Sequence, residues 1–199
     1  MKVFIDLGTY NGNVMKEAYK RYSDFDLFIG FEPMPDLYKK TKKRFASNNK
    51  ISIKRYAAGT KNIDGVKLYT NIATKNNKTF IGKGSTLFKD KISGGINKDQ
   101  FVLVDIIDFS EYLSNKFKND DYIILKIDIE GEEYDLLEHL INTGNISFIN
   151  ELYCEWHYNK IDNKNITEER HNKLIKNLNE LGFKLTGNNK KDEYSKRFK

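Results

Sequence analysis

The sequence has few of the features that stabilise secreted and membrane proteins. Its 199 residues include a single cysteine, Cys154, so no disulfide can form within the chain. No apolar stretch approaches the roughly 20 residues that a membrane-spanning helix requires. A strand-like segment follows Met1 directly, so we expect no signal peptide before the fold. We therefore expect a cytoplasmic protein in a reducing compartment.

The balance of residue types is that of a globular domain. Hydrophobic residues make up 39% and charged residues 31% of the chain, which is long enough to bury a core. We expect one domain over residues 1–186 and a polar, mobile tail over residues 187–199. The net charge of +6 suggests nucleic acid, but the basic residues are spread thinly or share a helix face, and no aromatic–basic motif stands out. A solvated helix face is the simpler interpretation.

The rest of the chain is organised around residues 2–12, KVFIDLGTYNG. Val3, Phe4 and Ile5 form a short apolar run that predicts a strand, and the strand is broken by a turn at Gly8. Apolar residues then recur at helical spacing, so a helix should begin near residues 11–13. A strand, a glycine turn and a helix N-terminus together are typical of the entrance to a nucleotide site.

The spacing within this segment narrows the choice of ligand. A dinucleotide fingerprint reads G-x-G-x-x-G, whereas this chain has Asp6-x-Gly8-x-x-x-Gly12, with Tyr10 in place of the middle glycine. Asp6 would repel a pyrophosphate but suits a cationic ligand. Glu32 ends the next apolar run, at the position of a ribose-binding acid. A ligand with a ribose, a positive charge and no phosphate is S-adenosylmethionine.

Strands and helices alternate along the chain, which predicts an α/β, Rossmann-like doubly wound fold with a mostly parallel sheet. The expected strands cover residues 27–32, 51–58, 101–107, 122–127 and 148–156, with a hairpin arm at 66–70 and a short last strand at 183–186. The expected helices cover residues 35–48, 108–117, 132–142 and 167–181. Residues 71–99 are rich in Lys, Asn and Gly, and form either a lid over the site or a surface insertion.

A second group of charged residues lies at the ends of two expected strands. Lys126, Asp128 and Glu130 alternate with apolar residues and therefore point to one side, and Glu155 and His157 are again two apart. Because ligands of parallel α/β sheets bind beyond the carboxyl ends of the strands, these groups should lie near the bound nucleotide. Two simpler interpretations stay open, in which His157 is a bonded loop histidine and Lys126 only pairs with Asp128. No role is expected for the other two histidines, His139 and His171.

With these motifs the sequence resembles the FkbM-type methyltransferases, a family of class I S-adenosylmethionine-dependent enzymes. The matching segments are residues 4–12, 31–33, 57–59, 84–86, 104–113, 125–132 and 151–157. The resemblance implies methyl transfer to a hydroxyl, commonly on a sugar or a natural product. This chain departs from the family at Thr9 and Tyr10, where small residues are more usual, and the antiparallel C-terminal hairpin of the class I fold is expected to be abbreviated.

The resemblance and the spacing together assign roles. The residues expected to bind the methyl donor are Asp6, Gly8, Tyr10, Asn11, Gly12, Glu32, Pro33 and Ala58. The residues expected to act in catalysis are His157, Asp128, Glu130, Lys126 and Glu155. His157 has an ordinary pKa near ~6.5 and suits a general base. Alternatively, Asp128, Glu155 and His157 together hold Mg²⁺ or Mn²⁺.

The expected acceptor is a small molecule or a glycan. Two other functions stay open on the sequence. One is methylation of a ribose hydroxyl in nucleic acid, in which Lys126 would take the proton. The other is a non-catalytic module that binds S-adenosylmethionine for regulation or assembly.

Overall fold

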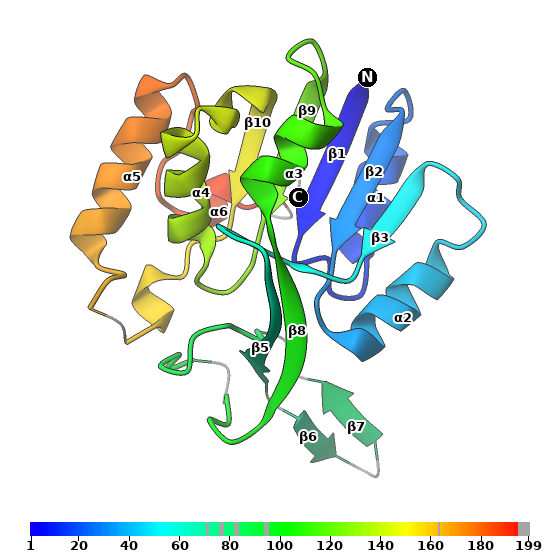
Figure 1. Ribbon diagram of the computed structural model, residues 1–199, viewed down its shortest axis with the longest axis vertical. Helices are drawn as coiled ribbons and strands as arrows, with labels where there is room; N and C mark the ends of the chain where they lie inside the picture. Colours follow the sequence, from blue (N-terminus) through cyan, green and yellow to red (C-terminus); the bar gives the residue numbers. More distant parts are fainter. Residues whose placement is uncertain (71, 76–77, 82–83, 94–95, 163, 195–199) are drawn as a thin grey trace.

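A five-stranded parallel sheet forms the centre of the computed structural model (Figure 1). The structure describes residues 1–70, 72–75, 78–81, 84–93, 96–162 and 164–194. The strand order is β10–β9–β1–β2–β3, and all neighbouring pairs are parallel. The strands are β1 (Lys2–Leu7), β2 (Leu27–Phe31), β3 (Ile51–Lys54), β9 (Tyr122–Ile127) and β10 (Ile149–Cys154). The predicted doubly wound α/β architecture is confirmed.

The order of the strands reverses at β1, which has β2 on one side and β9 on the other. Such a reversal opens a crevice beyond the carboxyl ends of the strands, and ligands of this architecture bind there. In the register of β1 and β9, Asp6 lies opposite Lys126 and Leu7 opposite Ile127. The turn after β1 and the charged segment after β9 therefore emerge side by side at that crevice.

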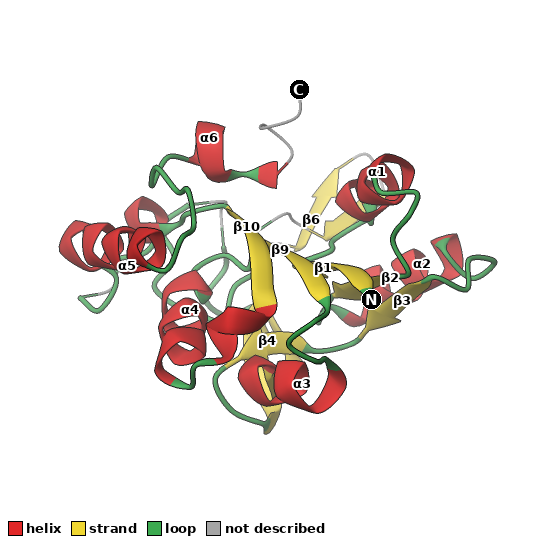
Figure 2. Cartoon of the chain, turned by 90° about the horizontal axis from the view of Figure 1, so that it is seen from above, coloured by secondary structure: helices red, strands yellow, loops and turns green. Residues whose placement is uncertain are grey.

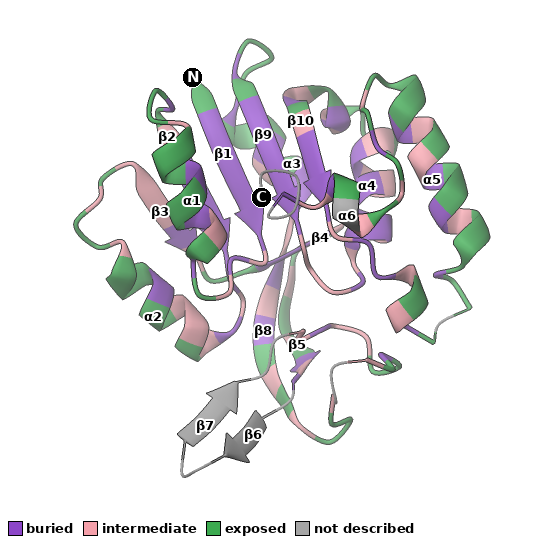
Figure 3. Cartoon of the chain, turned by 180° about the vertical axis from the view of Figure 1, so that it is seen from behind, coloured by how far each residue is buried: buried purple, intermediate pink, exposed green. Residues whose placement is uncertain are grey.

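Alternation along β1 divides the core between the two faces of the sheet. Val3, Ile5 and Leu7 pack with helices α3 (Phe109–Lys116), α4 (Glu133–Asn142) and α5 (Glu168–Glu180). Phe4 packs on the opposite face with α1 (Asn13–Arg21) and with Tyr194 near the C-terminus. Figure 2 shows these layers from above, and Figure 3 shows that the central strands are buried along nearly all their length. Burial on both faces explains why these strands read as continuous apolar runs.

Helix ends follow the local sequence signals. Asp108 caps α3 by accepting a hydrogen bond from the backbone N–H of Glu111 at 3.0 Å, and Thr167 caps α5 in the same way. Helix α2 (Pro35–Arg44) opens on a proline, as expected, but it ends at Arg44 rather than near residue 48. In the described part of the chain, no helix has both the length and the apolar character needed to cross a bilayer.

The expected strand over residues 51–58 is wrong, because the chain leaves the central sheet at Arg55. After β3, a separate strand β4 (Ala57–Gly59) pairs with β8 (Phe101–Asp108) in a second sheet. The long strand β8 also pairs antiparallel with β5 (Ile63–Tyr69), which confirms the expected hairpin arm. Figure 1 shows β5 and the outer end of β8 extending beyond the carboxyl edge of the central sheet.

Residues 71–99 contain more regular structure than expected. Strands β6 (Ile72–Lys75) and β7 (Lys78–Ile81) form an antiparallel hairpin. Residues 84–92 then return to the main body, where the backbone of Lys91 forms a bridge to Ile161. Of the four glycines in this segment, those at 82, 94 and 95 lie outside the described residues.

The expectations for the C-terminal region are also corrected. Residues 183–186 form no strand, and residues 187–194 pack on the body, with a short helix α6 (Asn189–Asp192). The buried carboxylate of Asp192 accepts hydrogen bonds from Trp156 Nε1 at 3.0 Å and from the backbone N–H of Gly187 at 2.7 Å. His171, 3% exposed, contacts Tyr134 Oη at 3.2 Å. The polar composition of this segment predicted a free tail. That prediction was wrong because the sequence does not show that Asp192 binds a buried group of the distant residue Trp156.

Candidate functional site

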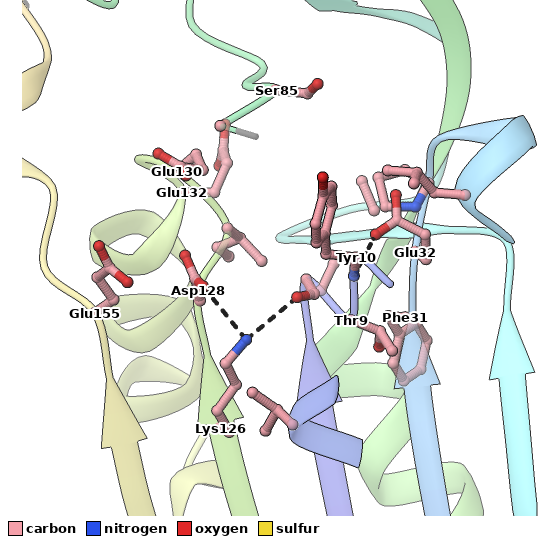
Figure 4. A pocket seen from close by; sticks show the side chains of 18 of the residues that line it. Thr9, Tyr10, Phe31, Glu32, Ser85, Lys126, Asp128, Glu130, Glu132 and Glu155 are labelled. Atoms are coloured by element: carbon pink, nitrogen blue, oxygen red, sulfur yellow. Dashed lines mark hydrogen bonds and ion pairs between the residues drawn. The ribbon is translucent and has the colours of Figure 1, made fainter. Parts of the chain in front are cut away.

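A cavity of about 400 Å³ lies at the crevice beyond β1, β2, β9 and β10 (Figure 4). One end is formed by the turn at residues 8–12 and by Glu32, and we call it the turn end. The other carries four carboxylates, Asp128, Glu130, Glu132 and Glu155, and we call it the acidic end. The wall is completed by Gly84, Ser85 and Leu87 and by the segment around β4.

Packing against neighbouring protein explains both glycines of the turn. Gly8 has φ +80°, and a Cβ atom there would lie 1.9 Å from the backbone oxygen of Asp128. Gly12 has φ +77°, and its Cβ would lie 2.6 Å from the ring of Phe45. Gly12 does not line the cavity, whereas the predicted contacts Gly8, Tyr10, Asn11, Pro33 and Ala58 all do. The sequence thus located the turn correctly. It did not reveal that the two glycines are required by close contacts with other parts of the protein.

Glu32 joins the end of β2 to the turn. Its carboxylate accepts hydrogen bonds from the backbone N–H groups of Tyr10 at 2.7 Å and Met34 at 2.9 Å. Burial raises the pKa of Glu32 to about 7, although the two N–H groups oppose the shift, and Asp6 raises it further. A carboxylate has further acceptor capacity beyond two N–H groups, so Glu32 can receive a hydroxyl donor such as those of a ribose.

Asp6 does not face the cavity, and this corrects its expected contact with a cationic ligand. Its fully buried carboxylate pairs with Lys126, with 2.9 Å between Oδ1 and Nζ. Lys126 Nζ also lies 3.5 Å from Asp128 Oδ2 and 3.2 Å from the backbone oxygen of Gly8. Burial lowers the pKa of Lys126, but Asp6 and Asp128 more than offset this and leave it above its ordinary value. Lys126 is therefore an ammonium group at neutral pH and cannot accept a proton.

His157 lies behind the acidic end and does not line the cavity. It is 0% exposed, and its Nδ1 is 2.9 Å from Glu133 Oε1. Its Nε2 lies 3.2 Å from Glu130 Oε2 and 3.5 Å from Glu155 Oε1. Burial lowers the pKa of His157, but the surrounding carboxylates outweigh it and raise the pKa to about 10. The expectation of a neutral imidazole base is therefore corrected, because His157 is a buried imidazolium at neutral pH.

Asp128 is better suited to proton transfer than its neighbour Glu155. Its side chain is 29% exposed and lines the cavity. Burial raises the pKa of Asp128 to about 6, against the opposing effect of Lys126, and Glu155 raises it further. By contrast, the contact with His157 holds the pKa of Glu155 well below its usual range, and Lys160 adds to this effect at 3.0 Å. General bases work best with a pKa near the operating pH, which favours Asp128 over Glu155.

Glu133 is a buried residue of this region to which the sequence analysis assigned no role in the site. It is 0% exposed, and its two oxygens accept hydrogen bonds from the backbone N–H groups of Ile129 at 3.0 Å and Gly131 at 2.9 Å. These bonds fix the loop in which Glu130 has φ +58°, a conformation that non-glycine residues rarely adopt. The sequence offered one indication of this role, namely the position of Glu133 two residues after Gly131. However, an acidic residue in the first turn of a helix is explained more simply by its favourable interaction with the helix dipole.

Lys91 is a second residue whose role was missed. Its side chain is 2% exposed, and Nζ lies 2.5 Å from Glu130 Oε2 and 2.6 Å from the backbone oxygen of Gly84. Nearby, Thr86 Oγ1 donates to the backbone oxygen of Glu130 at 2.7 Å. Lys91 is therefore paired within the protein and is not available to attract an acidic ligand, and Lys83 lies outside the described residues. Residues 84–91 are fastened to the acidic end through Glu130.

The acidic end also contains ligand types that hard metal ions prefer. Oxygen atoms of Asp128 and Glu130 and a ring nitrogen of His157 lie within 4.8 Å of one another, so Glu130 takes the place expected for Glu155. However, Lys126 Nζ already lies 3.5 Å from Asp128 Oδ2 and supplies a cation to that carboxylate. Lys91 already supplies a cation to Glu130. The residues therefore fit a metal ion poorly, and no step is assigned to one.

Comparisons with known proteins identify the family of the chain. No match was found among curated proteins. A solved structure, that of the methyltransferase FkbM from Methylobacillus flagellatus KT, matches with 14% identity and a TM-score of 0.42, over 71% of this chain and 30% of that one. The chain thus spans less than a third of that protein. The family model of the methyltransferase FkbM domain matches residues 6–185. The chain therefore belongs to the FkbM methyltransferase family.

Proposed function

We propose that the protein transfers a methyl group from S-adenosylmethionine to a hydroxyl group of a sugar or glycan. The observation that carries the proposal is one cavity with two chemically different ends. The turn end offers Glu32 for ribose hydroxyls, and the acidic end offers Asp128 as a base. Family membership supports the methyl donor, and the choice of a hydroxyl acceptor rests on the acidic end.

The turn end fits the donor by its chemistry. Glu32 supplies a carboxylate at the end of β2, and the side chains of Leu37, Leu68 and Tyr56 give an apolar wall for a base. Lys126, the one cationic side chain that lines the cavity within the described residues, is neutralised by Asp6. A cationic ligand therefore meets no uncompensated positive charge there.

The protein's own residues account for the acceptor's proton. A bound S-adenosylmethionine supplies a methyl group that is already activated by its sulfonium. Asp128 accepts the hydroxyl proton as the acceptor oxygen bonds to the methyl carbon, while the carbon–sulfur bond breaks and its electron pair stays on sulfur. Lys126 and His157 hold the Asp128 region in place as fixed cations. Orientation of the two reactants contributes on the order of 7–11 kcal/mol to such reactions.

Replacing Glu32 with glutamine is expected to weaken donor binding by about 1.5–3 kcal/mol, the usual range for hydrogen bonds to a charged group. Calorimetry with S-adenosylmethionine and with its demethylated product measures the effect. The matched control is Asp36→Asn, which changes an exposed carboxylate four residues away. If the unaltered protein binds a nicotinamide dinucleotide and neither of these ligands, the proposed donor is wrong.

Replacing Lys91 with methionine is expected to release residues 84–91 from Glu130. Loss of a buried charged hydrogen bond of about 1.5–3 kcal/mol should raise the rate of proteolytic cleavage in this segment about tenfold or more. The acceptor KM should rise with it, and donor affinity should stay unchanged. Lys89→Met is the control, because Lys89 is exposed in the same segment. Equal cleavage of the two variants would show that Lys91 does not fasten the segment.

No observation favours the other two functions. The ribose methyltransferase hypothesis depended on Lys126 as a base, and the carboxylates around Lys126 keep it protonated. Filter binding to RNA with a steep salt dependence would revive that hypothesis. The non-catalytic hypothesis predicts donor binding without turnover over a broad panel of hydroxyl acceptors.

A further inference from the structure

Within the described part of the chain, three of the four carboxylates of the acidic end form an ion pair with a lysine of the protein, and Glu132 does not. Lys126 lies 3.5 Å from Asp128, Lys91 lies 2.5 Å from Glu130, and Lys160 lies 3.0 Å from Glu155. Among the described residues, no hydrogen bond or ion pair reaches the side chain of Glu132. It lines the cavity all the same, and Figure 4 shows it beside Glu130 on the wall across from Tyr10.

No cationic side chain that the structure describes forms an ion pair with Glu132. Burial raises the pKa of Glu132 to about 7, the acidic residues Asp135 and Glu133 raise it further, and Arg170 opposes the shift. The guanidinium group of Arg170 is bound to other carboxylates, at 2.5 Å from Asp135 and 2.7 Å from Glu138. A partly buried carboxylate without a partner is costly, and a ligand bound in the cavity that Glu132 lines can supply one.

We propose that the acceptor carries an ammonium group close to the hydroxyl that is methylated, as an amino sugar does, and that Glu132 binds this group. The inference rests on the proposed function and narrows its substrate class. An ammonium group would give the fourth carboxylate the cation that the other three obtain from lysines. Charge-assisted hydrogen bonds of this kind are about twice as strong as neutral ones, so Glu132 is a specificity-determining residue.

Two matched acceptors test the inference, namely methyl glucosaminide with a free amine and the same sugar with the amine acetylated. Binding of each is measured by calorimetry to the protein saturated with S-adenosylhomocysteine, at low and high salt. The free amine should bind about tenfold more tightly or better, and the preference should shrink at high salt. Glu132→Gln should abolish the preference. Glu169→Gln, which changes an exposed glutamate in the first turn of α5, should preserve it.

The outcomes separate this inference from the function on which it rests. Equal binding of the two sugars, or binding of neither, contradicts the inference while retained donor binding leaves the methyltransferase proposal intact. Weaker S-adenosylmethionine binding in Glu132→Gln, with the sugar preference unchanged, assigns Glu132 to the donor's amino group and overturns the inference. Failure of the unaltered protein to bind S-adenosylhomocysteine contradicts both.

Discussion

Replacing Asp128 with asparagine is expected to lower the turnover number by roughly 10²–10⁴-fold, the range for losing general acid–base catalysis. Asparagine keeps the size of the side chain but cannot accept a proton. Affinity for S-adenosylmethionine should stay nearly unchanged, because Glu32 and the turn at residues 8–12 lie at the other end of the cavity. Single-turnover kinetics with radiolabelled donor, together with calorimetry, measure the two quantities separately.

Asp120→Asn is the control for this experiment, because Asp120 is exposed and distant from the cavity. Full activity of Asp128→Asn would show that the catalytic base lies elsewhere. A chelator provides a separate test on the unaltered enzyme. Activity that is lost on chelation and restored by magnesium or manganese would assign Asp128, Glu130 and His157 to a metal ion after all, whereas unchanged activity leaves Asp128 as the base.

Replacing His157 with alanine is expected to lower the free energy of unfolding by about 3–5 kcal/mol, the usual cost of removing one partner of a buried ion pair. The buried Glu133 carboxylate would lose its 2.9 Å contact, and Glu130 and Glu155 would lose the cation between them. Chemical denaturation at neutral pH, with chelator present, measures the change. A loss of activity in this variant therefore reports on folding before it reports on catalysis.

His139→Ala is the matched control, since His139 is partly exposed and pairs only with Asp108 among the described residues. Its effect should stay within about 1 kcal/mol, as for surface ion pairs. The pH dependence gives a second measurement. Since folding raises the pKa of His157 from 6.5 to about 10, its stabilising effect should be complete below pH 6.5 and lost as the pH rises through about 10. A loss of stability in His157→Ala that does not vary with pH would instead indicate a neutral ring.

Several features of the site could be predicted from the sequence because they depend on neighbours along the chain. The apolar runs before Gly8 and Glu32 predict two buried strands, and parallel strands bring their carboxyl ends together. The alternation of Lys126, Asp128 and Glu130 likewise predicts that charged groups meet at that edge. The structure confirms this meeting, because the rules of strand geometry and sheet topology apply whatever lies between the strands.

Other features depended on the tertiary structure. Residues 51–58 read as one strand, but β3 and β4 enter different sheets because their pairing partners, β2 and β8, lie far apart in the sequence. The polar segment at residues 187–194 packs on the body because Asp192 accepts a hydrogen bond from Trp156, which is again distant in the sequence. The local sequence pattern indicates only which residues suit a strand or a loop. It does not indicate which distant strand or side chain will be the partner.

The charge states of the site belong to this second group. The sequence by itself determined that His157, Asp128 and Lys126 lie at the carboxyl edge of the sheet, but the tertiary structure decided what each can do there. Glu133, Glu130 and Glu155 converge on His157 and keep it protonated, while Asp6 does the same for Lys126, which is why Asp128 is the base in the proposed mechanism. The physical reason is that a pKa depends on burial and on charges within a few ångströms, and only folding sets both.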